Sequence, residues 1–198
     1  RQGEGGPRCP PILVGVSSGP RALELAGEIA DGVVVTGQVC HVPTVGKLRE
    51  HVAVGLGRRA ARPTGFPFCI GAAAAVHPDC TVALRAVKPT VASYLQSAIV
   101  ELDAAGNAAR ERVAAGYDVY SHMNPAAAHA AAIPDELVSQ FAIAGTAEQC
   151  REQCRTLFAA GVDEITIRPY AVDRGSRADT IRTFAQEVVA AFRQPKVT

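Results

Sequence analysis

A serine flanked by glycines stands where the sequence predicts that a strand gives way to a helix. Residues 15–19 read Gly-Val-Ser-Ser-Gly, which fits the pattern G-x-S-x-G of hydrolases that hold a nucleophilic serine on such a turn. Catalysis by Ser17 would need an acid and, after it, a histidine further along the chain. The side chains that could fill these roles fall in a helical region and not at the strand ends: Asp103 or Asp118 with His122 or His129. A serine hydrolase is therefore an alternative that these positions disfavour.

The same loop suits an anion. Residues 17–19 stand directly before a helix, whose first N–H groups lack partners and whose dipole is positive at that end. A phosphate is the natural ligand of such a loop, and a guanidinium matches phosphate oxygens in a bidentate way. The arginines that could supply it follow the last predicted strand: Arg168, Arg174 and Arg177. The alternative, equally compatible with the residues, is that Ser18 and Gly19 only cap the helix.

Length and charge exclude several function classes. A chain of 198 residues, 48% hydrophobic, is long enough for one sizeable core. The formal net charge is only +1 and basic residues are spread among acidic ones, so we expect neither a nucleic acid nor an anionic membrane as partner. No apolar run reaches the length of a membrane span, and the N-terminal residues lack the apolar core of a signal peptide. The sequence therefore predicts a cytoplasmic protein.

Cysteines and histidines show no metal-ligand spacing. The six cysteines include no C-x-x-C pair, so we expect reduced thiols. Cys150 and Cys154 form an i, i+4, i+7, i+8 stripe with Leu157 and Phe158, which favours packing in the core over metal binding. The five histidines lack patterns such as H-E-x-x-H. We therefore expect no metal site.

Apolar runs without alternation recur along the chain and are separated by stretches with helical periodicity. Such runs predict strands covered on both faces, at residues 12–16, 33–36, 66–76 and 162–168. Helices are expected at residues 20–31, 43–61, 78–115 with a break at 105–107, 146–161 and 177–192. Residues 134–146 predict a short helix followed by an extended segment. Thr146 and Gln149 have the spacing of a capping box at the start of one of them.

This alternation indicates parallel strands joined by right-handed crossovers. Four strands are too few to close a barrel, so the sequence predicts an α/β fold that corresponds to half of an eight-stranded (β/α) barrel. We expect a flexible segment rich in Gly and Pro at residues 1–10, and then one half-barrel domain over residues 11–198. A helical insertion at about residues 95–140 is expected before the last strand.

Three separated stretches resemble the luciferase-like monooxygenase family, particularly its branch that depends on the deazaflavin coenzyme F-420. The first is PPILVGVSSGPRALELAGEIADGVVV at residues 10–35, and the second is YDVYSH at residues 117–122. The third is DELVSQFAIAGTAEQCREQCRTLFAAGVDEITIRP at residues 135–169. They occur in the same order as in the family, and they align only with its C-terminal half.

The resemblance implies a TIM-type barrel of which this chain supplies strands five to eight, with the insertion before strand eight. It implies an oxidoreductase that performs hydride transfer or monooxygenation with coenzyme F-420 or, alternatively, with FMN. The residues matched to the cofactor's phosphate site are Val16, Ser17, Ser18, Gly19 and Thr36, with Arg177 or its rival Arg168 from the last βα loop. Val39 stands where some relatives place a basic residue.

Half a barrel also implies a partner. The family's first four strands bring the residues that face the ring of the flavin or deazaflavin, so no catalytic residue is assigned in this chain. Two sheet edges and an apolar inner face would lie uncovered. We therefore expect the cofactor and a small-molecule substrate as ligands, and a second copy or a complementary N-terminal half barrel as the covering partner. A non-catalytic remnant or assembly subunit with the same fold is the alternative.

Overall fold

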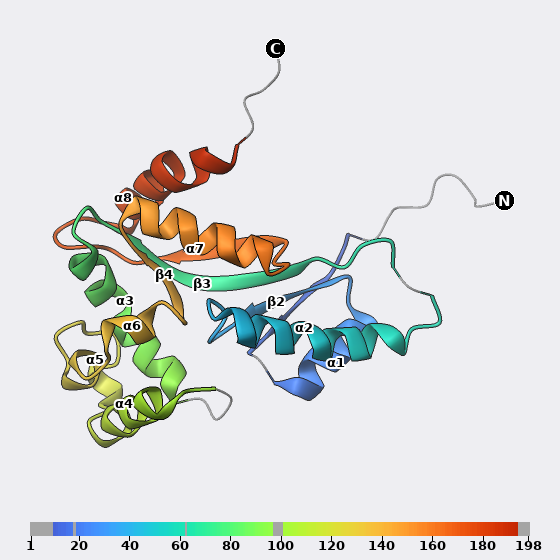
Figure 1. The fold of residues 1–198 in the computed structure, drawn as a ribbon, viewed down its shortest axis with the longest axis horizontal. Helices are drawn as coiled ribbons and strands as arrows, with labels where there is room; N and C mark the ends of the chain where they lie inside the picture. The colour runs from blue at the N-terminus through green and yellow to red at the C-terminus, as the bar shows by residue number, and fades with distance from the viewer. Residues whose placement is uncertain (1–9, 18, 62, 97–100, 194–198) are drawn as a thin grey trace, which may run out of the picture.

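The computed structural model describes residues 10–17, 19–61, 63–96 and 101–193. Apart from Pro10, the segment expected to be flexible lies outside these residues. The described part is an α/β fold with one sheet, in which every paired strand is parallel to its neighbour (Figure 1). Its strands are β1 (Leu13–Val16), β2 (Gly32–Thr36), β3 (Phe68–Val76), β4 (Ala142–Gly145) and β5 (Glu164–Pro169).

The long strand β3 organises the sheet. Its first half pairs with β2, which in turn pairs with β1, and its second half pairs with β4. Strand β5 pairs with residues 69–74 of β3, overlapping both, so β5 must lie on the opposite edge of β3 from β2 and β4. The four expected strands are present in a parallel sheet, and the fifth, β4, forms within residues 134–146, for which the sequence predicts a short helix and then an extended segment.

The helices fall between the strands much as the periodicity predicts. Their bounds are α1 (Pro20–Ile29), α2 (Val42–Gly57), α3 (Cys80–Leu95), α4 (Ala104–Ala115), α5 (Ala128–Ala131), α6 (Asp135–Val138), α7 (Ala147–Ala159) and α8 (Arg177–Thr183). A 3₁₀ turn, η1 (Val119–Ser121), precedes α5, and a π turn, η2 (Phe184–Val188), and a 3₁₀ turn, η3 (Val189–Phe192), continue α8. No helix among the described residues is long and apolar enough to cross a membrane.

The break in the long helical region lies earlier than expected. Helix α3 ends at Leu95 and α4 begins at Ala104, so the break precedes residues 105–107. The reason is a cap: the Asp103 carboxylate accepts a hydrogen bond from the Gly106 N–H at 2.7 Å. Gly106 therefore lies in the first turn of a helix and does not interrupt one. By contrast, the capping box of Thr146 and Gln149 is present at the start of α7.

One face of the sheet is covered by helices along its whole width. Side chains that alternate along β2 and β3, such as Val35 and Ile70, pack on α1, α2, α7 and the turns after α8. Cys150, Cys154 and Leu157 of α7 are buried in this core as predicted, whereas Phe158 is 39% exposed. Phe158 instead meets Phe192 edge to face, with 5.6 Å between ring centroids.

The opposite face is covered only at one end. Helix α3 packs on Ala73 and Ala75 of β3, and α4, α5 and α6 complete a second core there. Figure 1 shows these four helices gathered at one end of the sheet, with α1 and α2 at the other. The remaining positions on this side are here called the open face, and strand register assigns to it Leu13, Gly15, Val34, Thr36, Gly71, Glu164, Thr166 and Arg168.

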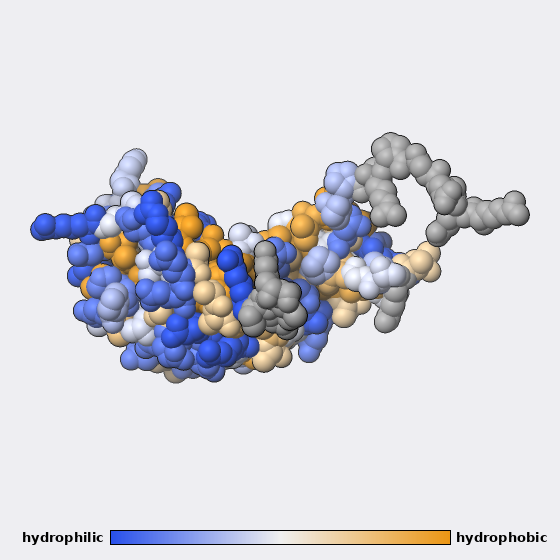
Figure 2. Space-filling view, turned by 90° about the horizontal axis from the view of Figure 1, so that it is seen from above, coloured by the Kyte–Doolittle hydropathy of each residue, from blue (hydrophilic) through white to orange (hydrophobic). Residues whose placement is uncertain are grey.

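The prediction that every strand is buried on both faces is wrong for the two outer strands. Leu13 of β1 is 45% exposed, and residues of β5 alternate between exposed and half-buried. Both strands lie at an edge of the sheet, and α3 faces only the carboxyl end of β5 on this side, so the open-face side chains of Leu13, Glu164 and Thr166 are exposed. Figure 2 shows the molecule hollowed between its two ends, with hydrophobic residues at the surface on both sides of the hollow.

Candidate functional site

The predicted phosphate loop and the end of β2 meet at one edge of the sheet. Val16 ends β1 and pairs with Val35, which places the next residues of both strands side by side. Ser17 Oγ lies 3.4 Å from Thr36 Oγ1, so the two hydroxyls converge on one point. Ser18 lies outside the described residues. This is the edge at which parallel α/β sheets bind their ligands, because the βα loops and helix N-termini gather there.

The start of α1 is open to an anion. Gly19 is the N-cap and makes no side-chain capping bond, and Pro20 at the first helical position has no N–H. The N-cap residue therefore offers no side-chain acceptor to the next N–H groups of this ten-residue helix, which is a condition that favours a bound anion. A Cβ on Gly71 would lie 3.0 Å from Thr36 Cγ2, and one on Gly15 would meet no atom within 4 Å. The two hydroxyls and the N–H donors of the first turn are groups that suit a phosphate.

The structure gives Ser17 no catalytic base. Its polar neighbour is Thr36, and among the described residues no histidine is hydrogen-bonded to it. His122 contacts the Val119 carbonyl through Nδ1 at 2.8 Å, and His129 is buried against Tyr117 with neither ring nitrogen bonded. The geometry therefore does not support a serine hydrolase.

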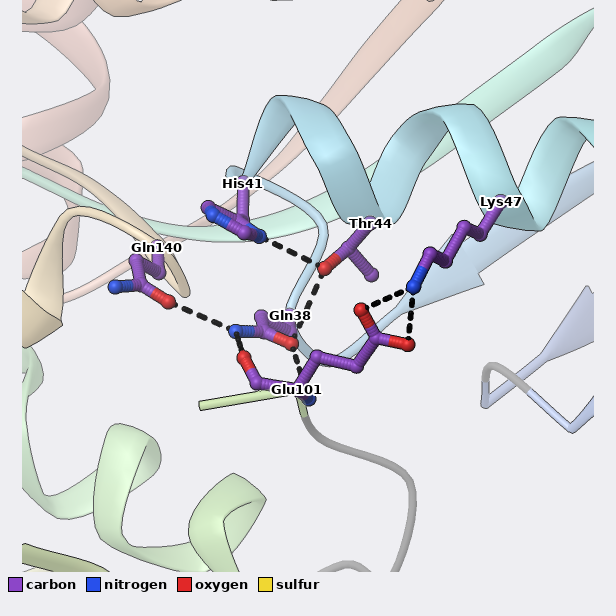
Figure 3. Close-up of polar contacts among 6 residues, drawn as sticks. All are labelled: Gln38, His41, Thr44, Lys47, Glu101 and Gln140. Atoms are coloured by element: carbon purple, nitrogen blue, oxygen red, sulfur yellow. Dashed lines mark hydrogen bonds and ion pairs between the residues drawn. The ribbon is translucent and has the colours of Figure 1, made fainter. Parts of the chain in front are cut away.

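The loop that follows Thr36 is held by one buried amide, Gln38, which is 2% exposed (Figure 3). Its Nε2 donates to the Glu101 carbonyl and to Gln140 Oε1, both at 2.8 Å. Its Oε1 accepts from the Glu101 N–H at 3.1 Å and from Thr44 Oγ1 at 3.2 Å. All four hydrogen-bonding positions of the amide are filled, so the loop is fixed to α2 and to the segments that flank α4 to α6. The sequence gives no indication of this role, because Glu101 and Gln140 lie 63 and 102 positions away in the chain.

Around Gln38, two further contacts complete the arrangement. Thr44 Oγ1 donates to Gln38, so it accepts from His41 Nδ1 at 2.9 Å, and burial lowers the pKa of His41, with Glu101 acting in the opposite sense. Lys47 Nζ lies 2.6 Å from both carboxylate oxygens of Glu101. Val39, which stands where some relatives have a basic residue, is fully buried in the helix-covered core. Its side chain therefore belongs to the core and leaves the phosphate site without a cation at that position.

Arg168 and Arg177 lie together at a second location. Both line a cavity of about 260 Å³ between α3 and the carboxyl end of β5. The residues that line it are Thr90, Ser93, Tyr94, His122, Met123, Arg168, Pro169, Tyr170 and Arg177. The structure thus brings together Ser17, Gly19 and Thr36 at one place and the two arginines at another, along the same side of the sheet.

Tyrosines fix the arginine at the end of β5. Arg168 Nη2 donates to the Tyr94 hydroxyl at 2.5 Å, and the guanidinium lies 5.8 Å from the Tyr94 ring centroid and 5.9 Å from that of Tyr170. Tyr170 is itself held at three points, by the Ala74 carbonyl, by the Thr180 hydroxyl and by the Thr90 hydroxyl. Neither tyrosine is among the site residues predicted from the sequence. Tyr170 follows Arg168 by two residues at the end of a strand, and this position could have marked it as a candidate site residue.

A larger cavity lies elsewhere and suits an anion poorly. It measures about 500 Å³ and lies against α6, α7 and the loop after β2. Its charged lining residues are all acidic: Asp135, Glu136 and Glu152. Negative side chains repel a phosphate, so the smaller arginine-lined cavity and the β1–α1 loop are the better candidates for anionic ligands.

The buried thiols of Cys150 and Cys154 are poor nucleophiles. Burial raises the pKa of Cys150 to about 12 and that of Cys154 to about 11, with the Cys154 charge adding to the effect at Cys150. Both thiols therefore stay protonated near neutral pH, and the thiolate is the nucleophilic form. Within the described residues no group of His, Cys, Asp or Glu is arranged to hold a metal ion.

Comparison with known families agrees with this arrangement. Residues 1–164 match the profile of the luciferase-like monooxygenases. The chain belongs to the luciferase-like monooxygenase family. The match includes the β1–α1 loop, Thr36 and β4, and it ends at the start of β5.

Solved structures of similar fold include one whose name gives coenzyme F-420 and one whose name gives FMN. The coenzyme F-420-dependent tetrahydromethanopterin reductase from Methanopyrus kandleri superposes with a TM-score of 0.76 at 22% identity, over 92% of this chain and 51% of that one. The monooxygenase RslO1 from Streptomyces bottropensis gives 0.54 at 19% identity, over 93% and 49%. The oxygenating constituent of 3,6-diketocamphane monooxygenase from Pseudomonas putida, in complex with FMN, gives 0.50 at 15%, over 92% and 48%. At these low identities, the superpositions establish the fold alone. This chain spans about half the length of each of these three proteins.

Proposed function

We propose that the protein is a luciferase-like oxidoreductase that holds the phosphate of coenzyme F-420 or, alternatively, of FMN with the loop between β1 and α1. The observation that carries the proposal is the convergence of Ser17 Oγ and Thr36 Oγ1, 3.4 Å apart, beside the uncapped start of α1. In this proposal Val16, Ser18 and Gly19 supply backbone to the same loop. The names of two similar structures, one dependent on F-420 and one in complex with FMN, support this choice of cofactors.

When bound, such a cofactor supplies the redox centre for hydride transfer or oxygenation. This chain's own residues bind and orient. The Ser17 and Thr36 hydroxyls would donate to phosphate oxygens, and the first N–H groups of α1 would add backbone donors. The small residues Gly15 and Gly71 leave the open face free of side chains next to this point. A planar ring attached to the phosphate would therefore have room to lie along that face.

Removal of the two hydroxyls tests the phosphate site. We expect Ser17→Ala combined with Thr36→Val to weaken FMN and F-420 at least tenfold, because each lost hydrogen bond to a charged group is worth about 1.5–3 kcal/mol. Riboflavin, which lacks the phosphate, should bind both proteins equally. Fluorescence titration of the purified protein with the three compounds measures this. The control is Ser139→Ala, at an exposed serine that precedes β4 and whose Oγ donates to the Glu136 carbonyl. Equal binding of FMN by the wild type and the double variant would contradict the proposed site.

We further propose that the sheet is half of an eight-stranded barrel, completed by a second copy of the chain or by a complementary N-terminal half. Supporting observations are the order β1, β2, β3, β5 of parallel strands, the helices on one face, and the open face on the other. The catalytic residues would then come from the covering half. A catalytically incomplete half barrel or assembly subunit is the alternative, and it would bind no cofactor or bind it without turnover. A cytoplasmic location remains part of this proposal.

Association in solution tests the covering partner. We expect light scattering on the protein alone to give a mass of at least twice the 20.6 kDa of one chain. The reason is that β1 and β5 present unpaired edges and that Ile12 and Leu13 are 66% and 45% exposed. Leu13→Lys should shift the protein toward the monomer. Val54→Lys should not, because Val54 is 48% exposed on α2, which covers the other face of the sheet. A stable monomer at micromolar concentration would contradict the need for a covering partner.

A further inference from the structure

The cavity that contains Arg168 and Arg177 carries unneutralised positive charge. Within the described residues neither arginine has a carboxylate oxygen within 4 Å, whereas Arg182, on the same helix as Arg177, pairs with Asp179 at 2.6 Å. Arg168 donates one N–H to the Tyr94 hydroxyl, and a guanidinium has five N–H donors. Most of its donors are therefore available to a ligand in the cavity.

This cavity is also rigid before any ligand arrives. Thr90, 4% exposed on α3, is hydrogen-bonded to the Tyr170 hydroxyl, and Tyr94 stacks on Phe141 with 6.3 Å between ring centroids. Both tyrosines that flank Arg168 are thus fixed by buried partners. A guanidinium held in this way loses little conformational freedom on binding, which is the condition for a specific anion site.

The lining combines charge with aromatic surface. Two arginines, two tyrosines and the His122 ring surround a volume of about 260 Å³. Ligand cavities for drug-sized molecules span about 300–1,000 Å³, so this one takes a small molecule or one end of a larger one. His122 donates its Nδ1 proton to the Val119 carbonyl when the ring is neutral, which leaves Nε2 as a further acceptor at the cavity.

Its position relates the cavity to the phosphate loop. Thr36 pairs with Gly71 and Arg168 pairs with Ala73, so both residues belong to the open face. Strand geometry separates them by two strand spacings of about 4.8 Å and by two residues at about 3.3 Å each. A ring bound along the open face from the loop at Thr36 would therefore reach toward the arginines.

We propose that this cavity binds the anionic group of the substrate, and that the substrate class is a small aromatic carboxylate or phosphate ester. The inference rests on the proposed function for the identity of the reaction, but the cavity's binding does not depend on the cofactor. The two arginines bind the anion, and the ring of the substrate lies against Tyr94, Tyr170 and His122. This assignment replaces, for Arg168 and Arg177, the role at the cofactor's phosphate that the family resemblance implies.

Calorimetric titration of the purified protein with benzoate and with phenyl phosphate tests the proposal. We expect at least one of them to bind, benzyl alcohol not to bind, and inorganic phosphate to bind at least tenfold more weakly than phenyl phosphate. Because the chain has no tryptophan and four tyrosines, two of which line the cavity, binding should also change the tyrosine emission. No binding of either aromatic probe, or equal binding of phenyl and inorganic phosphate, would overturn the proposal.

Single arginine variants locate the site. Arg168→Gln and Arg177→Gln should each weaken the bound aromatic probe at least tenfold, and Arg174→Gln, an exposed arginine of the same loop, should leave it unchanged. Arg177 is exposed, so its replacement is not expected to affect folding, and a thermal unfolding curve checks this. Unchanged probe affinity in both variants would refute the site.

The same variants separate this inference from the proposed function. If Arg177→Gln weakens FMN at least tenfold but leaves riboflavin and the aromatic probe unchanged, the arginine serves the cofactor's phosphate and the substrate assignment is wrong. If Ser17→Ala with Thr36→Val leaves FMN affinity unchanged while Arg177→Gln loses the probe, the proposed cofactor site fails and the cavity stands.

Discussion

We expect Gln38→Glu to lower the free energy of unfolding by at least about 3 kcal/mol, although the two side chains have nearly the same shape. In the native protein, Gln38 Nε2 donates to the Glu101 carbonyl and to Gln140 Oε1. A carboxylate in its place would put a negative oxygen against two acceptors. A buried group that loses its hydrogen-bond partner costs about 1–3 kcal/mol, more when it is charged, and two such contacts are affected here.

Denaturant titration of the wild type and the variant measures this change. Gln186→Glu, an exposed amide on the turn after α8, is the matched control and should alter stability by no more than about 0.5 kcal/mol. The deficit of Gln38→Glu should shrink as the pH falls, because a protonated carboxyl can donate again from one oxygen. A deficit below about 1 kcal/mol, or one independent of pH, would show that the amide does not hold the loop.

The consequence for function lies in the neighbouring residues. Gln38 follows Thr36 by two positions, and Gly37 between them has a φ of 112°, which only glycine adopts without strain. A loop that loses the Gln38 anchor would let the end of β2 move. We therefore expect the same variant to weaken FMN, because the distance between the Ser17 and Thr36 hydroxyls would no longer be fixed.

Local patterns predicted the elements well. The apolar runs that became β2 and β3, and the capping box of Thr146 and Gln149, depend on residues within a few positions of each other. Their structural meaning can therefore be deduced from spacing alone. Burial of the outer strands could not be deduced in the same way, since the runs in β1 and β5 look alike whether or not another unit covers them. Only the sheet order shows that they lie at its edges.

One part of the candidate site could likewise be predicted from local patterns, and another part could not. Ser17, Gly19 and Thr36 follow from the rule that parallel strands end at one edge, and the structure brings the two hydroxyls together. The arginine cavity depends on contacts between α3 and β5, such as Arg168 with Tyr94, 74 positions apart in the chain. No periodicity or motif encodes a pairing at that separation. The same is true of Gln38, whose partner Gln140 lies 102 positions away.

Glycines in α2 show how a local rule can point in the wrong direction. A glycine inside a helix costs roughly 0.5–1 kcal/mol relative to alanine, so Gly55 by itself weakens the helix. In the structure Gly55 is buried where α2 crosses α1, and an added Cβ would lie 1.8 Å from the Glu24 carbonyl oxygen. Gly27 of α1 has the reciprocal position, with a Cβ 2.3 Å from the Val52 oxygen. The glycines therefore permit the close approach of the two helices.

We expect Gly55→Ala to destabilise the protein by at least about 3 kcal/mol, because the neighbouring atom is backbone and cannot rotate away. Gly46→Ala, in the same helix, is the matched control and has the opposite sign. A Cβ there meets nothing within 4 Å, so the substitution should stabilise by roughly 0.5–1 kcal/mol. Thermal and denaturant unfolding of the two variants measure the pair. Stabilisation by both would show that α1 and α2 do not cross this closely.

The added methyl group in Gly55→Ala should displace α1, and this displacement should also affect the proposed phosphate loop. Glu24 lies one turn along α1 from Pro20, so a methyl group that pushes on the Glu24 carbonyl moves the N-terminal end of the helix with it. Because the donors of the first turn and Ser17 are fixed to that end, FMN affinity should fall at temperatures where the variant is still folded. Gly46→Ala leaves α1 in place and should bind FMN as the wild type does. Loss of stability without loss of FMN affinity would separate the packing of α1 from its proposed function.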